Sequence, residues 1–385
     1  MSVEQRVCRQ FEREFGDLPS LLVRAPGRVN LIGEHTDYNE GFVLPMAIDQ
    51  AIWIALRPRT DRQVILHSLD FGQVHTFSLD SLQHSGAGWA EYVKGVAWAL
   101  MEAGYVLRGW EGVVAGDVPI EAGLSSSAAI EMAAARAFAA VSGLPWKAAT
   151  MARLGQKAEN QWVGVNCGIM DQLISAAGQA GHALLIDCRS LETRAVPVPA
   201  SARFIVLDSA APRTLAGSAY NQRRAECESA VSKLRAVYPE IRALRDVTLE
   251  MLEAHGELLT PIELQRARHV VSENDRVLQS VKALQEGDLA LFGRLMIASH
   301  ESLRHDYEVS SFELDTLVEL AMATPGVLGA RLTGAGFGGC AIALAYAEQA
   351  TAAAKAIIAR YQEITHRSGQ AYVCTPSQGA QAWSV

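Results

Sequence analysis

Three features that would indicate other kinds of protein are missing from this sequence of 385 residues. Its six cysteines are scattered without a C-x-x-C pair, which argues against a disulfide framework or a zinc site and favours reduced thiols in the cytoplasm. Its 34 basic residues are outnumbered by 42 acidic ones, and this formal net charge of -8 argues against a nucleic-acid partner, which needs a clustered basic surface. No long apolar run lies between Met1 and Asp17, and the most apolar expected helix carries Glu131 and Arg136, so neither a signal peptide nor a membrane span is predicted.

Motifs of three large enzyme classes are also missing or misplaced. No G-x-x-x-x-G-K-[ST] sequence occurs, which excludes a P-loop NTPase, and no G-x-S-x-G occurs, which leaves a hydrolase without support. Gly334 to Gly339 formally matches G-x-G-x-x-G, but a dinucleotide fingerprint joins a strand to a helix early in a Rossmann unit. The following residues, Cys340 to Leu344, are typical of a strand, so a Rossmann dehydrogenase is rejected.

The most informative stretch that is present runs from Pro119 to Ala129 and reads P-I-E-A-G-L-S-S-S-A-A. An apolar run before it (112–118) predicts a strand, and an alanine-rich run after it (128–141) predicts a helix. The start of a helix carries unpaired N–H groups and the positive end of the helix dipole, which together suit an anion. A single serine cap is the simpler interpretation, but three serines behind Gly123 favour a phosphate group. The stretch therefore predicts a nucleotide site.

A second polar stretch follows an expected strand at Leu21–Val23 and gathers charged side chains in a loop punctuated by Pro26, Gly27 and Gly33. The charged and polar members of this loop are Arg28, Glu34, His35, Asp37 and Tyr38. A metal site is weakly supported because no H-x-x-x-H pair accompanies them, and a solvated turn is the simplest alternative. A sugar site fits better, because each hydroxyl of a sugar both donates and accepts a hydrogen bond.

In the remaining chain, the kind of secondary structure that the sequence predicts changes near residue 200. Expected before it are helices at 3–15, 89–101 and 145–163, antiparallel strands at 42–48, 51–57, 63–69 and 74–79, a loop and small-residue helix at 166–177, and a hairpin at 182–198. Expected after it are a strand at 204–207, long charged helices between 217 and 322, strands at 326–332, 340–345 and 371–374, and a helix at 349–361. We therefore expect two domains, 1–200 and 201–385.

Three motifs in a fixed order resemble the GHMP small-molecule kinases. They are G-R-V-N-L-I-G-E-H-T-D-Y at 27–38, G-L-S-S-S-A at 123–128 and T-G-A-G-F-G-G at 333–339. The first is similar to the galactokinase signature nearly letter for letter and is far more specific than the other two. The segments 167–172 and 183–191 also resemble galactokinase segments, so the resemblance covers essentially the whole chain.

This resemblance implies a fold and a reaction. The fold is α+β, with two domains of the GHMP kinase type and the active site in the cleft between the N- and C-terminal domains. The reaction is the ATP-dependent phosphorylation of D-galactose at the C1 hydroxyl, giving galactose 1-phosphate and ADP, with Mg²⁺ accompanying ATP. The expected partners are galactose and ATP in the cytoplasm, with no nucleic acid or membrane, and the oligomeric state stays open, a monomer included.

The resemblance also assigns roles to individual residues. Asp171 corresponds to the catalytic base, although the sequence leaves open whether it takes the proton or orients the hydroxyl, and Arg28 corresponds to the arginine that pairs with it. The sugar-binding residues are Glu34, His35, Thr36, Asp37 and Tyr220, and the Mg²⁺ ligands are Ser127 and Glu159. The ATP-binding residues are Glu121, Ala122, Gly123, Leu124, Ser125, Ser126 and Ser127, with Trp89 near the adenine.

One position departs from the family, and two alternatives remain. Where the family has glycine this chain has Glu121, whose charge would repel a triphosphate, so we expect it to point outward. A related sugar kinase acting on N-acetylgalactosamine or arabinose is one alternative. A galactokinase-like sensor that binds sugar and ATP without turnover is the other, and the intact serine loop with Asp171 and Arg28 argues against it.

Overall fold

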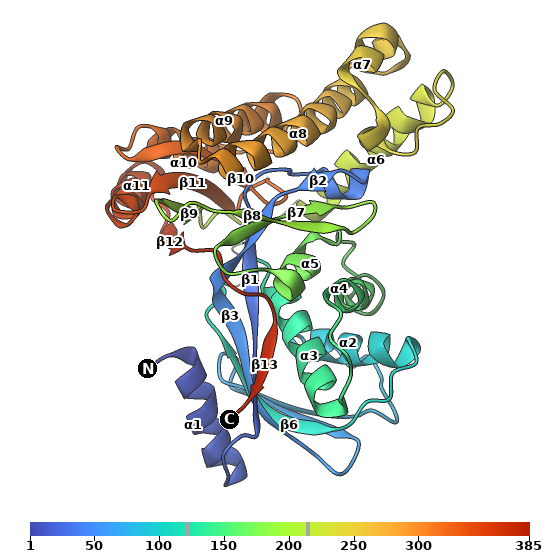
Figure 1. The fold of residues 1–385 in the computed structure, drawn as a ribbon, viewed down its shortest axis with the longest axis vertical. Coiled ribbons are helices and arrows are strands. Elements are labelled where there is room, and N and C mark those ends of the chain that lie inside the picture. The colour runs from blue at the N-terminus through green and yellow to red at the C-terminus, as the bar shows by residue number, and fades with distance from the viewer. Residues whose placement is uncertain (120–122, 213–215) are drawn as a thin grey trace. The chain divides into compact units, whose positions relative to one another are not determined.

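The computed structural model describes residues 1–119, 123–212 and 216–385, and these form two compact units (Figure 1). The first unit comprises Met1–Arg28, Ala47–Ala180 and Ser377–Val385, and the second comprises Val29–Met46 and Gly181–Pro376. Neither unit is a continuous piece of chain. The expected division near residue 200 falls inside the second unit, because the hairpin that precedes it pairs with Phe42 and Val43.

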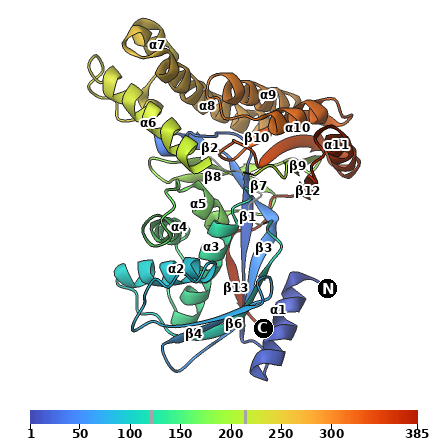
Figure 2. The same cartoon turned by 180° about the vertical axis from the view of Figure 1, so that it is seen from behind.

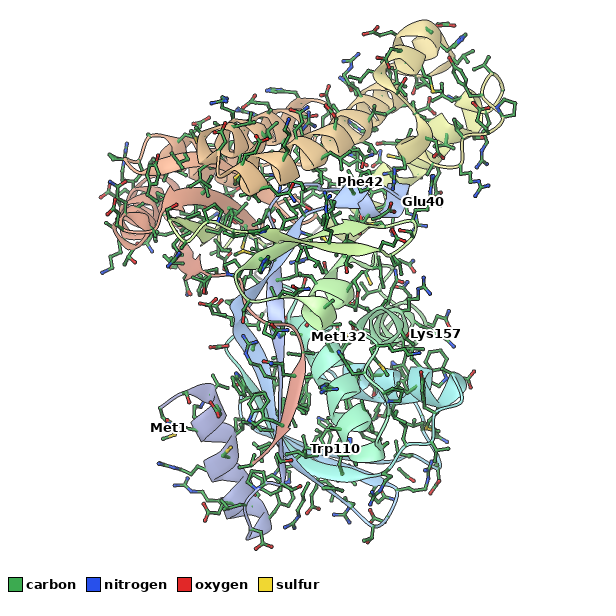
Figure 3. All side chains as sticks on the ribbon, viewed as in Figure 1. Met1, Glu40, Phe42, Trp110, Met132 and Lys157 are labelled. Carbon is green, nitrogen blue, oxygen red and sulfur yellow. The ribbon has the colours of Figure 1, made fainter. Side chains whose placement is uncertain are left out.

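The first unit is built on a six-stranded sheet with helices on both faces (Figures 1 and 2). Its strand order is β13 (Gln381–Ser384), β1 (Leu21–Asn30), β3 (Pro45–Pro58), β6 (Trp110–Gly116), β4 (Gln63–Ser68) and β5 (Gln73–Ser78). Helix α1 (Val3–Phe15) covers one face, and the other carries α2 (Ala90–Glu102), α3 (Ser126–Ser142), α4 (Ala148–Lys157) and α5 (Met170–Ala177). Trp110 is fully buried and meets Phe138 of α3 edge-on, with ring centroids 5.6 Å apart (Figure 3).

The second unit contains two antiparallel sheets and most of the long helices. One sheet has the order β10 (Val327–Thr333), β11 (Cys340–Tyr346), β9 (Ala202–Asp208) and β12 (Gln370–Cys374), and the other has the order β2 (Phe42–Val43), β7 (His182–Asp187) and β8 (Thr193–Pro197). The helices are α6 (Ala216–Leu234), α7 (Leu249–His255), α8 (Pro261–Glu286), α9 (Leu289–His305), α10 (Phe312–Met322) and α11 (Ala350–Thr365). A core of buried hydrophobic side chains joins the four-stranded sheet to these helices.

Local sequence explains the elements that were predicted well. Helix α1 starts with a capping box between Ser2 and Gln5 and ends at Gly16 in the left-handed conformation, so both of its ends are specified by local residues. Residues 334–339 join strand β10 directly to strand β11, which agrees with the rejection of a dinucleotide-binding unit. No disulfide joins any of the six cysteines, all of which the structure describes. None of the helices among the described residues is long and apolar enough to span a membrane.

Three expectations about local structure were wrong. Strand β1 does not end at Val23 but continues through Pro26 and Gly27, where a Cβ on Gly27 would lie 2.7 Å from the Leu124 carbonyl oxygen. The strands at 42–79 are not one antiparallel run, because β6 lies between β3 and β4 and pairs in parallel with β4. The helix expected at 145–163 is α4 followed by the π-helix η2 (Ala158–Val163).

Candidate active site

The predicted phosphate loop joins β6 to α3, as expected. Gly123 and Ser125 both have positive φ, 77° and 58°, and α3 begins at Ser126. Ser125 occupies the N-cap position, yet its hydroxyl makes no capping hydrogen bond, so the interpretation of the loop as a simple serine cap is wrong. Glu121 and Ala122 lie outside the described residues, and the expected orientation of Glu121 stays a prediction.

The two predicted catalytic side chains form a bidentate ion pair within the first unit. Arg28 donates from Nε to Asp171 Oδ1 at 2.8 Å and from Nη2 to Asp171 Oδ2 at 2.7 Å, a planar fork matched to a carboxylate. Its Nη1 donates to the Gly123 carbonyl oxygen at 2.6 Å, and Ser125 donates to Asp171 Oδ2 at 2.5 Å. These bonds fix the Asp171 carboxylate to both strand β1 and the phosphate loop.

Glu159, the predicted Mg²⁺ ligand, lies in the π-helix η2 and is 5% exposed. Its Oε2 accepts hydrogen bonds from Gln172 Nε2 at 2.6 Å and from Cys167 Sγ at 3.1 Å, and the carboxylate is also bonded by the Ser127 hydroxyl. Burial raises the pKa of Glu159, although the bond from Cys167 partly opposes that effect. The structure thus brings the two predicted metal ligands into contact.

Trp162 anchors the π-helix to α2. A Cβ on Gly95 of α2 would lie 3.1 Å from the Trp162 side chain, so glycine allows the indole to pack closely. The indole Nε1 donates to Glu91 Oε2 at 2.8 Å. Burial opposes the charge of Glu91, but hydrogen bonds from the Ala87 N–H, Trp162 and others outweigh it and lower the pKa of Glu91 to about 2. Because π-helical turns are rare and recur at functional sites, this arrangement agrees with a role for Glu159.

The donors at Ser127 and Glu159 fit a magnesium ion bound together with phosphate. Among residues 1–119, 123–212 and 216–385, no group of three or more His, Cys, Asp or Glu side chains could hold a metal. Mg²⁺ differs from zinc in this respect, since it usually takes one or two carboxylates and completes its shell with phosphate oxygens and water. One buried carboxylate beside one hydroxyl is such a donor set.

In the second unit, Glu34 connects the signature loop to the glycine motif. Its Oε1 accepts hydrogen bonds from the Gly334 N–H at 2.8 Å and the Thr333 hydroxyl at 3.0 Å, and it pairs with Arg331 at 3.3 Å. Its Oε2 accepts from Asn30 Nδ2 at 2.9 Å, and the residue is 2% exposed. The carboxylate therefore holds the loop from 333 to 339 in place, and this structural role is separate from its predicted role in sugar binding.

His35 begins a chain of hydrogen bonds whose direction can be assigned. Its Nε2 lies 3.2 Å from the Ala335 carbonyl oxygen, which only accepts, so Nε2 carries the proton. Burial lowers the pKa of His35 to about 3, so the ring is neutral and its Nδ1 accepts from the Tyr38 hydroxyl at 2.8 Å. Tyr38 then accepts from Tyr307 at 2.7 Å, and Tyr307 accepts from Cys227 at 3.2 Å. Both nitrogens of His35 are thus bonded within the protein.

The other predicted sugar-binding residues lie close to this chain. The Thr36 hydroxyl is buried and bonds to the carbonyl oxygens of Gly33 and Phe42, which makes it a support of the loop. Asp37 is partly exposed and begins the 3-10 helix η1 (Asp37–Asn39). Tyr220 comes from α6, and its ring centroid lies 5.6 Å from that of His35, so the structure brings it to the signature loop from far along the sequence.

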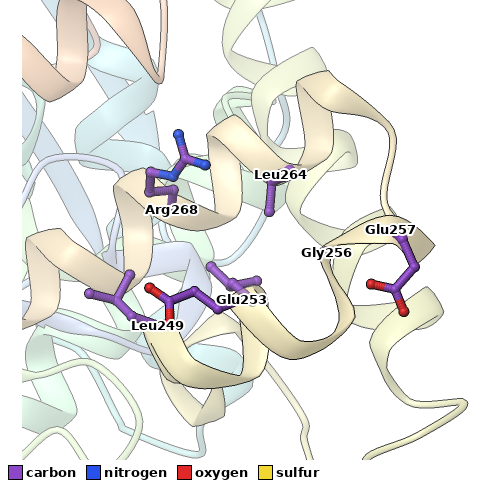
Figure 4. Close-up of a pocket in the computed structure, with 7 residues that line it drawn as sticks. Leu249, Glu253, Gly256, Glu257, Leu264 and Arg268 are labelled. Carbon is purple, nitrogen blue, oxygen red and sulfur yellow. The ribbon is translucent and has the colours of Figure 1, made fainter.

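Trp89 and a pocket between α7 and α8 have neighbours other than the predicted site residues described above. Trp89 stacks on Phe71 with ring centroids 6.0 Å apart and donates to Gln73 at 3.1 Å, so its place near an adenine stays a prediction. A pocket of about 370 Å³ lies between α7 and α8 (Figure 4). None of the predicted site residues lines it; its lining residues are Leu249, Leu252, Glu253, Gly256, Glu257, Leu264 and Arg268.

Several polar residues of these clusters were not predicted. Gln172, Cys167, Arg331, Thr333 and Tyr307 bond directly to the predicted residues, and Glu131 bonds to Gln172. A signal was available for Glu131, because it and Arg136 are the charged residues of an otherwise apolar helix, and Glu131 lies one turn after Ser127. Three of the others, Cys167, Gln172 and Thr333, lie within the segments 167–172 and 333–339 that resemble the family, and Arg331 lies two residues before the second of these. No spacing in the sequence relates Tyr307 to the site.

Comparisons with known proteins agree with this geometry. Family models match the galactokinase galactose-binding signature at residues 9–58, the GHMP kinases N terminal domain at residues 91–179 and the GHMP kinases C terminal domain at residues 280–363. A galactokinase of Roseiflexus sp. (strain RS-1) is 51% identical over 370 residues, covering 96% of this chain and 95% of the relative. The chain belongs to the galactokinase family. Another member, the galactokinase of Chloroflexus aurantiacus (strain ATCC 29366 / DSM 635 / J-10-fl), is 50% identical over the same shares of both chains.

Solved structures of galactokinases and of other GHMP kinases share the fold. The crystal structure of Lactococcus lactis galactokinase complexed with galactose has a TM-score of 0.93 and 38% identity, covering 99% of this chain and 100% of that one. The mevalonate kinase of Methanococcus jannaschii has a TM-score of 0.67 and 20% identity, covering 93% of this chain and 99% of that one, which shows the fold alone. The predicted α+β fold of the GHMP kinase type is confirmed.

Proposed function

We propose that this member of the galactokinase family transfers the terminal phosphoryl group of ATP to the C1 hydroxyl of D-galactose, giving galactose 1-phosphate and ADP. The observation that carries this proposal is the bidentate pair of Arg28 and Asp171, bonded to the serine loop at the start of α3. It occurs in a chain that matches the galactokinase galactose-binding signature. The pair together with the intact serine loop argues against a sensor without turnover.

Phosphoryl transfer requires alignment of the reacting groups, neutralisation of phosphate charge and an acceptor for the hydroxyl proton. We assign the last role to Asp171, whose carboxylate Arg28 holds in one orientation. The glycine and serines of the loop from Gly123 to Ser127 are the proposed phosphate cradle, since backbone N–H groups at a helix start favour anions. Glu121 and Ala122 complete that proposed loop, and Trp89 is the proposed neighbour of the adenine.

Ser127 and Glu159 would hold Mg²⁺, which when bound neutralises charge on the phosphate oxygens. Sugar recognition is proposed for the signature loop and α6. Asp37 and Tyr220, both partly exposed, are the candidates for direct contact with hydroxyls. The bonds made by Glu34, His35 and Thr36 support a role in shaping the loop as well. The six cysteines without a disulfide agree with a reducing compartment, and we propose the cytoplasm.

A panel of sugars in a coupled ADP-release assay tests the function. We expect turnover with D-galactose to exceed that with N-acetylgalactosamine, arabinose or glucose. If turnover is highest with another sugar, that sugar replaces galactose as the proposed substrate. Binding of galactose by calorimetry with no ADP release would identify a sensor, and the proposal of catalysis would then be wrong.

A further inference from the structure

Gln172, the residue after Asp171 in the first turn of α5, contacts two carboxylates. Its side chain is fully buried, and its Nε2 donates to Glu159 Oε2 at 2.6 Å and to Glu131 Oε2 at 3.0 Å. An amide nitrogen carries two hydrogens, so each carboxylate receives one of them. We propose that Gln172, held in turn by Glu131, is a positioning residue that orients Glu159 toward the magnesium ion. This inference rests on the metal-binding role proposed above for Glu159.

Two of the donors to Glu159 approach the same oxygen. Both Gln172 Nε2 and Cys167 Sγ bond to Oε2, at 2.6 Å and 3.1 Å. Anchoring one oxygen of a carboxylate fixes the direction of the other, since the group is planar. Oε1 of Glu159 receives neither of these two donors, and it is the oxygen that we assign to the cation.

Glu131 holds Gln172 from the opposite side. It comes from α3, one turn after Ser127, and is fully buried. Burial, followed by the charge of Glu159, raises the pKa of Glu131 well above its ordinary value. Gln172 donates to both, so it separates groups that would otherwise repel each other. Glu131 thereby connects the helix that carries Ser127 to the side chain that anchors Glu159.

Two oxygens of this network have no hydrogen-bond partner among the residues that the structure describes. They are Oε1 of Glu131 and Oε1 of Gln172, and both are buried. A buried polar oxygen without a hydrogen-bond partner lowers the stability of the fold. A contribution to stability alone is therefore a poor explanation for a network that contains two of them. A positioning role explains it better, because the same turn of α5 then places both Asp171 and the anchor of Glu159.

The first test replaces the amide of Gln172. Gln172→Met keeps the length of the side chain and removes both donors. Loss of a residue that orients a metal ligand typically costs about 10- to 100-fold in metal affinity, so the Mg²⁺ concentration for half-maximal activity should rise at least about 10-fold while KM for galactose changes little. The matched control is Gln156→Met, because Gln156 also contacts this region, donating to the Cys167 carbonyl oxygen at 3.1 Å, but bonds to neither carboxylate. Its Mg²⁺ requirement should stay near that of the wild type.

The second test separates positioning from simple structural support. Glu131→Gln keeps an acceptor for Gln172 and should retain a nearly normal Mg²⁺ requirement, whereas Glu131→Leu removes the acceptor and should behave like Gln172→Met. Binding of Mn²⁺ in the presence of a non-hydrolysable ATP analogue, followed by electron paramagnetic resonance, gives a readout that is independent of turnover. Far-ultraviolet circular dichroism confirms that each variant is folded.

The outcomes distinguish this inference from the proposed metal site. Weakened Mn²⁺ binding in Gln172→Met and Glu131→Leu, but not in Glu131→Gln or Gln156→Met, supports it. Normal Mn²⁺ binding in Gln172→Met, with weak binding in Glu159→Gln, overturns the positioning role and leaves Glu159 as a ligand. Normal binding in Glu159→Gln itself overturns the proposed metal site as well. If Gln172→Met does not fold, equal Mn²⁺ binding by Glu131→Leu and Glu131→Gln overturns the inference.

Discussion

The ion pair between Arg28 and Asp171 should act as one unit in catalysis, and a double-mutant cycle can measure this. Asp171→Asn places one amide oxygen and one amide N–H₂ opposite the two donors of Arg28, so one of the two hydrogen bonds is lost. It also removes the proton acceptor. We expect kcat to fall by roughly 10²-fold or more, which corresponds to about 2.7 kcal/mol. Arg28→Ala leaves Asp171 bonded only to Ser125 within this cluster, so a loss of similar size is expected.

The size of the combined effect decides whether the two residues act together. Independent contributions would multiply to roughly 10⁴-fold, or about 5.4 kcal/mol. Because the two hydrogen bonds from Arg28 act by orienting Asp171, kcat of the double variant should instead be little lower than that of either single variant. The assay is kcat by coupled ADP release at saturating substrates, with galactose binding followed by calorimetry. A nearly normal kcat for Asp171→Asn, or a fully multiplicative loss in the double variant, would refute this reasoning.

A matched control comes from the second unit. Arg245 forms a similar bidentate pair with Asp187, at 3.1 Å and 2.9 Å, and has no proposed part in the chemistry. Asp187→Asn should lower the free energy of unfolding and leave kcat nearly unchanged. A comparable drop in kcat in this control would mean that the loss in Asp171→Asn reflects a general loss of structure.

Two further predictions concern sugar binding and stability in acid. Asp37→Ala should weaken galactose binding by roughly 10- to 100-fold, the usual value of a hydrogen bond to a charged group, and leave binding of a non-hydrolysable ATP analogue unchanged; calorimetry that shows equal losses for both ligands would indicate a folding defect instead. The lowered pKa of Glu91, about 2 against an ordinary value of 4.5, stabilises the fold above pH 4.5, and this contribution is lost as the pH falls toward 2. The difference in unfolding free energy between the wild type and Glu91→Gln should therefore shrink over that range in urea titrations, and a difference independent of pH would contradict the assignment.

How much the sequence could predict depends on how local each interaction is. Helix α3 and the loop before it follow from an alanine-rich run after glycine and serine, and α1 follows from its own caps. The π-helix at Ala158–Val163 could not be predicted, because it depends on Trp162 packing against α2 and bonding to Glu91. Strand β13 was also missed, since four residues without a periodic pattern pair with β1 only in the folded protein.

The same limit applies to the candidate site. The motifs located Arg28 and Asp171 by resemblance, and the structure adds that 143 residues of sequence separate two side chains that share a bidentate bond. The occupied nitrogens of His35 depend on Tyr38 and on the Ala335 carbonyl group, of which the second is 300 residues away. No pattern within a short window of sequence contains that information.

The pairing of β13 with β1 has a consequence for synthesis on the ribosome. Strand β1 is made early, but its outer neighbour arrives only after residues 181–376 of the second unit have been translated. During that interval the outer edge of β1 carries N–H and C=O groups that can pair with a strand of another nascent chain. The first unit therefore passes through a stage with an open sheet edge, and aggregation of newly made chains should begin at Leu21–Arg24, the residues that β13 later covers.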